Sequence, residues 1–95
     1  MSTFTIVALT ARPENLPEFL QLLAKSKIAL PTEPGCTSVR MYQDATDKHR
    51  FTVVEAWESE AHHRACIDHM MHSGAWARLR ELLVADPSFS YYREF

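Results

Sequence analysis

The chain has 95 residues, 46% of them hydrophobic and 23% charged, which is typical of one soluble globular domain spanning residues 1–95. Its 2 glycines, Gly35 and Gly74, stand far apart, whereas phosphate-binding loops and dinucleotide fingerprints need clustered glycines. The net charge is −2 and the 10 basic residues are dispersed, which argues against a nucleic-acid partner. We find no signal segment and no apolar run long enough to span a membrane, so we expect a cytoplasmic protein with free thiols at Cys36 and Cys66.

The first half of the chain predicts one helix between two strands. Residues 3–11 alternate in polarity and are rich in β-branched side chains, which predicts a strand partly buried on both faces. Pro13 opens a helical stretch that Pro31 and the turn over 33–35 end, and residues 36–43 predict the second strand. The apolar face of the helix comprises Leu16, Phe19, Leu20 and Leu23.

The second half begins with a hairpin. Residues 44–49 are polar and connect the second strand to a third over 50–57, and so short a link favours antiparallel pairing. The remaining expected elements are a helix from the N-cap Ser59 to about His72, a second helical segment after Gly74 over 75–85, and a last strand over 88–95.

This βαββα(α)β order predicts an α+β, ferredoxin-like fold, in which a four-stranded antiparallel sheet carries its helices on one face. The other face is then open. Both sides of the third strand carry apolar residues, Phe51 and Val53 on one side and Val54 on the other. Since 11% aromatic residues is much for so small a core, we expect a homodimer formed through the open sheet face rather than a monomer exposing apolar surface.

One carboxylate interrupts this apolar pattern. Glu55 lies in the middle of the third strand, between Val53 and Trp57. On a covered face its charge must be paired or its pKa must rise. Two interpretations follow: a structural ion pair with Arg40 on the neighbouring strand, or a role as proton acceptor or donor.

Four of the 5 histidines lie between residues 62 and 72. His62, Cys66 and His69 share one helical face, a spacing that can bind Zn²⁺ or Cu²⁺. One helix face, however, does not surround a tetrahedral ion, and no second ligand cluster is present in the sequence. We therefore expect no metal site.

The same histidines have other interpretations. His69 or His72 could line a pocket and act as an acid or base near neutral pH. His62 and His63 are expected to be solvated polar residues of the helix. Cys66 is interpreted as a small buried apolar residue.

Three features together resemble the antibiotic biosynthesis monooxygenase family. They are the Glu33-Pro34-Gly35-Cys36 turn before the second strand, the aromatic residues Tyr42 and Phe51, and the run Glu55-Ala56-Trp57-Glu58-Ser59. The resemblance covers nearly the whole chain. It implies a dimeric ferredoxin-like α+β barrel that oxidises quinol or phenolic substrates with O₂, using no metal, flavin or haem.

Carried onto this chain, the resemblance implies that Trp57 is the pocket tryptophan that orients an aromatic substrate. The candidate catalytic residues are His69, Glu55 and Tyr42, and the candidate substrate-binding residues are Trp57, Arg40, Val53, Phe51 and His72.

Two positions depart from the family pattern. Val53 stands where the anthracycline-type members carry Asn, and Cys66 stands where many quinol-monooxygenase-like members carry His. The expected function is a cofactor-independent monooxygenase acting on a small quinol or phenol. The alternatives are a small-metabolite isomerase of the same family and a non-catalytic small-molecule-binding module of the stress response.

Overall fold

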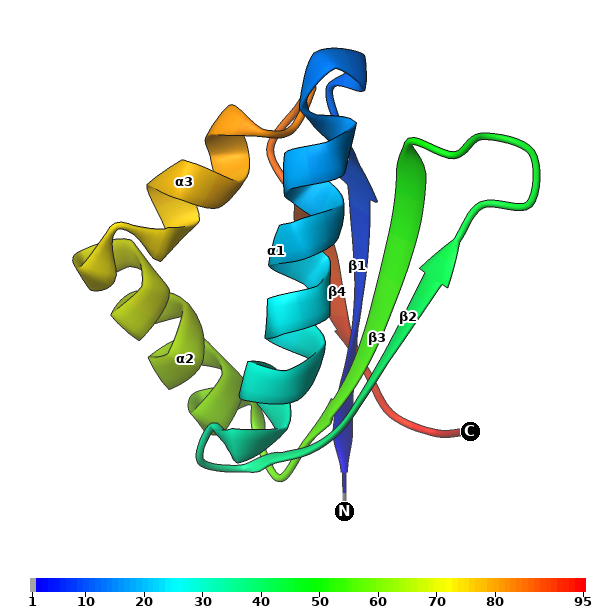
Figure 1. Ribbon diagram of the computed structural model, residues 1–95. Coiled ribbons are helices and arrows are strands. Elements are labelled where there is room, and N and C mark those ends of the chain that lie inside the picture. Colours follow the sequence, from blue (N-terminus) through cyan, green and yellow to red (C-terminus); the bar gives the residue numbers. More distant parts are fainter. Residues whose placement is uncertain (1) are drawn as a thin grey trace.

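The computed structural model describes residues 2–95 and has a four-stranded sheet with its helices on one face (Figure 1). The elements are β1 (Thr3–Thr10), α1 (Leu16–Ala29), β2 (Cys36–Gln43), β3 (Arg50–Trp57), α2 (Glu60–Ser73), α3 (Ala75–Glu81) and β4 (Ser88–Tyr92). Short 3₁₀ turns over Pro13–Asn15 and Leu30–Thr32 flank α1. The predicted α+β, ferredoxin-like arrangement is confirmed.

The strands are ordered β2-β3-β1-β4, and each neighbouring pair is antiparallel. The register aligns Met41, Val53, Val7 and Phe89 in one row across the sheet. Because side chains opposite one another in neighbouring strands share a face, this row lies on one side of the sheet. It is the side that the helices cover, because all four residues line a cavity together with residues of α1, α2 and α3.

The hydrophobic core fills one end of this interior. Phe19 of α1 is fully buried, and its ring lies 5.3 Å from the ring of Phe51. The buried residues of the core are Leu9, Ala11, Phe19, Phe51, Val53, Leu82 and Leu83. On α1 the expected apolar face holds for Leu16, Phe19 and Leu23. Leu20 is instead 43% exposed, and Leu22 lines the cavity.

The helical segment expected over 75–85 ends earlier, at Glu81. The next residues pair with the end of β1: the Arg12 N–H donates to the Leu82 carbonyl at 2.9 Å, and the Val84 N–H donates to the Thr10 carbonyl at 3.0 Å. These bonds replace helical ones, so the chain leaves the helix here. The last strand is also shorter than predicted and ends at Tyr92.

The opposite face of the sheet carries no helix of the described part of the chain and is partly apolar. Ile6 in the middle of β1 is 40% exposed, and the register places it opposite Val54 on one side and Ser90 on the other. Tyr42 and Tyr92 on the outer strands are also exposed. Among residues 2–95, no helix combines the length and the apolarity needed to cross a membrane.

Candidate functional site

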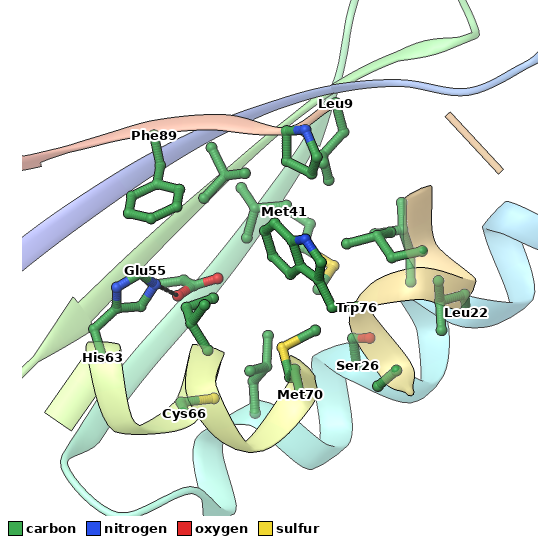
Figure 2. A pocket seen from close by; sticks show the side chains of 18 of the residues that line it. Leu9, Leu22, Ser26, Met41, Glu55, His63, Cys66, Met70, Trp76 and Phe89 are labelled. Carbon is green, nitrogen blue, oxygen red and sulfur yellow. Dashed lines mark ion pairs between the residues drawn. The ribbon is translucent and has the colours of Figure 1, made fainter. Parts of the chain in front are cut away.

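A cavity of about 180 Å³ lies between the helix-covered face of the sheet and helices α1, α2 and α3. Its wall is mostly apolar. The apolar lining includes Val7, Leu9, Leu22, Leu23, Met41, Val53, Ile67, Met70, Trp76, Leu79 and Phe89. Figure 2 shows the carboxyl group of Glu55 and the imidazole of His63 side by side in this wall, with Trp76 projecting from the opposite side. A small polar centre is thus set in an apolar chamber.

Glu55 is held by two donors from the sheet. The indole Nε1–H of Trp57 donates to its Oε1 at 2.9 Å, and the Thr5 hydroxyl donates to the same oxygen at 3.3 Å. Trp57 is two residues further along β3 and shares the inward face, and its side chain is fully buried. Burial raises the pKa of Glu55 above its ordinary value, and the two hydrogen bonds counteract part of that rise.

His63 reaches the same centre from α2. Ser59 caps this helix by accepting the His62 N–H at 3.3 Å, and the resulting helical phase turns His63 inward together with Cys66 and Met70. The Nε2 atom of His63 lies 3.9 Å from Oε1 of Glu55. Burial, and secondarily the nearby Arg64, lowers the pKa of His63, so its imidazole is neutral at pH 7.

Aromatic rings fix the plane of this imidazole. The His63 ring lies edge-on to Trp57, Phe89 and Tyr91, at centroid distances of 5.3, 5.0 and 5.4 Å. His63 is only 2% exposed, so the expectation that it is a solvated helix residue is wrong. The signal that could have found it is the apolar stripe of the helix, since Cys66, Ile67 and Met70 follow His63 at helical spacing.

The structure brings together three of the predicted site residues: Val53, Glu55 and Trp57 all line the cavity. The predicted histidines lie elsewhere. His69 and His72 are exposed on α2 and lie outside the lining that residues 2–95 provide. The helical phase that buries His63 and Cys66 turns these two side chains toward solvent.

The remaining predicted residues belong to other surfaces. The register pairs Arg40 with Val54 and Tyr42 with Thr52, which places both on the open face of the sheet. The interpretation of Glu55 as the ion-pair partner of Arg40 is therefore wrong, because Val39 is the residue opposite Glu55. Phe51 shares the inward face but packs in the core against Phe19.

The cysteine of the helix has little reactivity. Cys66 is a buried free thiol, and burial raises its pKa to about 11, so it stays protonated at neutral pH. Within residues 2–95, no group of three or more His, Cys, Asp or Glu side chains is arranged to hold a metal ion.

The spacing of Glu55 and His63 suits a ligand hydroxyl. A separation of 3.9 Å is too long for a direct hydrogen bond. It is short enough that one oxygen atom can lie within hydrogen-bonding distance of both groups. A hydroxyl there can donate to the carboxylate and accept from the imidazole, while the ring that carries it contacts the apolar wall.

The sequence model of a family described as antibiotic biosynthesis monooxygenase matches residues 3–78 of the chain. No protein with a curated description matches the sequence.

Several solved structures have the same fold. A conserved protein from Methanosarcina mazei superposes with a TM-score of 0.86 at 21% identity, covering 100% of this chain and 94% of that one. Rv0793 from Mycobacterium tuberculosis gives 0.78 at 21% identity, covering 100% and 96%. SnoaB, a cofactor-independent oxygenase from Streptomyces nogalater, gives 0.81 at 12% identity, covering 98% and 92%. At these identities the similarity establishes the fold.

Proposed function

The chain belongs to the antibiotic biosynthesis monooxygenase family, and from this premise we propose that it is a cofactor-independent monooxygenase that oxidises a small quinol or phenol with O₂. The observation that carries the proposal is the buried pair of Glu55 and His63 in the wall of an otherwise apolar cavity. Such a pair can take a proton from a bound hydroxyl and stabilise the oxyanion that remains.

The cavity indicates the size and charge of the substrate. Its volume of about 180 Å³ compares with the ~150 Å³ of an apolar protein cavity that binds benzene, so it fits one aromatic ring or two fused rings. The described residues that line it include neither Lys nor Arg. A carboxylated or phosphorylated phenol would find no counter-charge there and would be repelled by Glu55. The proposed substrate is therefore uncharged.

Proton removal is assigned to Glu55. Its raised pKa makes the carboxylate a stronger base than an exposed glutamate, and the bonds from Trp57 and Thr5 keep it in place. The neutral imidazole of His63 faces the same ligand oxygen through Nε2 and stabilises the negative charge that develops on it.

The deprotonated ring is electron-rich enough to reduce O₂ directly. One electron passes from the quinolate to O₂, and the semiquinone and superoxide combine by forming a C–O bond. Cleavage of the O–O bond then releases one oxygen atom as water, and the other stays on the ring of a hydroxyquinone. All four electrons that O₂ takes up come from the substrate. The apolar wall keeps water away from the radical pair.

The test is O₂ consumption by the metal-stripped protein with an uncharged naphthoquinol, measured against a protein-free control for autoxidation. We expect O₂ consumption above that of the protein-free control. With ¹⁸O₂ as the oxidant, we expect one ¹⁸O atom in the product. Glu55→Gln should lower kcat at least about 100-fold, as expected for loss of a general base. Trp57→Phe removes one donor to Glu55 and should lower kcat by a smaller factor.

The matched control is His69→Gln, because His69 lies on the same helix but is exposed and outside the cavity lining. Its turnover should stay within about twofold of the parent chain. O₂ consumption by the parent chain equal to that of the protein-free sample would contradict the proposal. An equal loss of kcat in His69→Gln and Glu55→Gln would contradict it as well. Fluorescence of Trp57 and Trp76, which both line the cavity, reports binding separately. Binding without O₂ consumption would favour the small-molecule-binding module instead.

We further propose that the protein works as a homodimer, with the open face of the sheet as the contact between two copies. Ile6, Tyr42 and Tyr92 expose 40%, 53% and 47% of their surface on this face. A second copy would present the same apolar residues in a self-complementary arrangement, as a two-fold interface requires.

A further inference from the structure

The side chain that contacts the far nitrogen of His63 comes from the edge strand β4. The Tyr91 hydroxyl lies 2.8 Å from Nδ1 of His63, a short hydrogen bond between two side chains 28 residues apart in the sequence. Tyr91 is half-buried, whereas its neighbour Tyr92 is exposed on the open face of the sheet. The two tyrosines thus differ in which face of the same strand they occupy.

The hydrogen bond decides what His63 can do, because a neutral imidazole carries one ring proton. If Tyr91 donates its O–H to Nδ1, the ring proton is on Nε2 and faces Glu55 and the cavity. If Nδ1 carries the proton and donates to Tyr91, Nε2 presents a lone pair instead. In that state His63 has no hydrogen to give to a ligand oxygen.

Charge favours the first arrangement. Oε1 of Glu55 lies 3.9 Å from Nε2, and a carboxylate at that distance attracts a proton on Nε2 rather than a lone pair. On the other side, the Arg64 guanidinium lies 5.1 Å from the centroid of the Tyr91 ring, and its charge acts to lower the pKa of the phenol, although burial raises that pKa by more. The charge of Glu55 thus favours the tautomer in which Tyr91 donates to Nδ1.

We propose that Tyr91 is a positioning residue that holds His63 in the Nε2–H tautomer, so that His63 donates a hydrogen bond to the substrate oxygen while Glu55 removes its proton. This role rests on the proposed function. The tautomer itself, however, is a property of the protein without substrate. It can therefore be decided whether or not the protein consumes O₂.

The test is the ¹⁵N NMR spectrum of the histidine rings at pH 7.5, with His63 assigned by comparison with His63→Gln. In the parent chain we expect His63 with Nε2 protonated and Nδ1 unprotonated. Tyr91→Phe keeps the ring and removes the hydroxyl, and it should populate both tautomers. Tyr92→Phe removes a hydroxyl from the adjacent, outward-facing residue and should leave the His63 signals unchanged.

Turnover provides the second measurement. Tyr91→Phe should lower kcat roughly tenfold with little change in KM, a smaller loss than the ~100-fold typical of removing an oxyanion donor itself. A His63 protonated on Nδ1 in the parent chain, or a tautomer that is unchanged in Tyr91→Phe, would overturn the proposal. If no variant consumes O₂, the proposed function fails, and the ¹⁵N spectra still decide the role of Tyr91.

Discussion

Burial gives His63 a measurable effect on stability. Its pKa in the folded chain is below the ordinary 6.5, so the unfolded chain takes up a proton at a pH where the folded chain does not. The contribution of His63 to the free energy of unfolding is fully present above pH 6.5. It declines as the pH falls from 6.5 through the pKa of His63 in the folded chain. Glu55 has the opposite effect, because its raised pKa lets the folded chain hold a proton at a pH where the unfolded chain has lost it.

Urea denaturation between pH 5 and 8 separates the two residues. His63→Gln should lose less stability than the parent chain on acidification from pH 7 to 5.5. Glu55→Gln should lose more, because the opposing contribution is gone. His69→Gln, at an exposed position, should follow the parent chain. The same pH slope in the parent chain and in His63→Gln would show that His63 titrates normally.

Glu55 and His63 differ in how well the sequence predicts that each lies in the site. Glu55 could be found, since a charge between Val53 and Trp57 on a covered strand requires an explanation. The sequence does not single out His63, because four histidines and one cysteine allow more than one inward stripe on the helix. The phase depends on where the helix begins and on what it packs against, and the second of these is tertiary information.

At the scale of the elements, the two glycines have a positive φ and stand where segments end or join. Gly35, at φ +82°, precedes β2, and its carbonyl accepts the Glu58 N–H at 2.8 Å. Gly74, at φ +87°, joins α2 to α3. They differ in their surroundings. A Cβ on Gly35 would lie 2.3 Å from Cγ of His62, whereas a Cβ on Gly74 would meet nothing within 4 Å.

This contrast predicts different costs for the same substitution. Gly74→Ala should lower the free energy of unfolding by about 1–2 kcal/mol, the strain of a left-handed alanine. Gly35→Ala should lose a further ~1–3 kcal/mol, because the start of α2 must move away from the new methyl group. Urea unfolding of both variants at one pH measures the difference. Equal losses would mean that the turn at Gly35 relaxes without disturbing α2.

Most element boundaries could be predicted, because Pro, Gly and the cap residue Ser59 mark them locally. What could not be predicted is which face each residue of β2 occupies. That depends on the pairing register with β3, which has an irregularity between Cys36 and Ser38. Arg40 and Tyr42 are predicted as site residues, whereas the register places them on the open face. The end of α3 at Glu81 likewise depends on pairing with β1, far away in the sequence.

At the scale of the whole molecule, the sheet separates two apolar surfaces with different roles. The inward rows line the core and the cavity, and the helices cover them. No helix or strand among residues 2–95 covers the outward rows, and Ile6 lies at their middle, between β3 and β4. A contact between two copies through this face would leave the cavities untouched, because they lie on the opposite side of each sheet.

The dimer proposal predicts a specific weak point. Ile6→Arg places a charge in the middle of the open face, where a second copy would bury it without a partner, and should weaken association at least about 100-fold. The comparison is Leu20→Arg, since Leu20 is similarly exposed, at 43%, but lies on α1. In light scattering at micromolar concentration, the parent chain and Leu20→Arg should show twice the 10.9 kDa of one chain, and Ile6→Arg should approach one chain mass.

Since association stabilises the folded state by mass action, the thermal unfolding temperature of the parent chain should also rise with protein concentration, and that of Ile6→Arg should not. A single-chain mass for the parent, or a dimer that survives Ile6→Arg, would exclude this face as the interface.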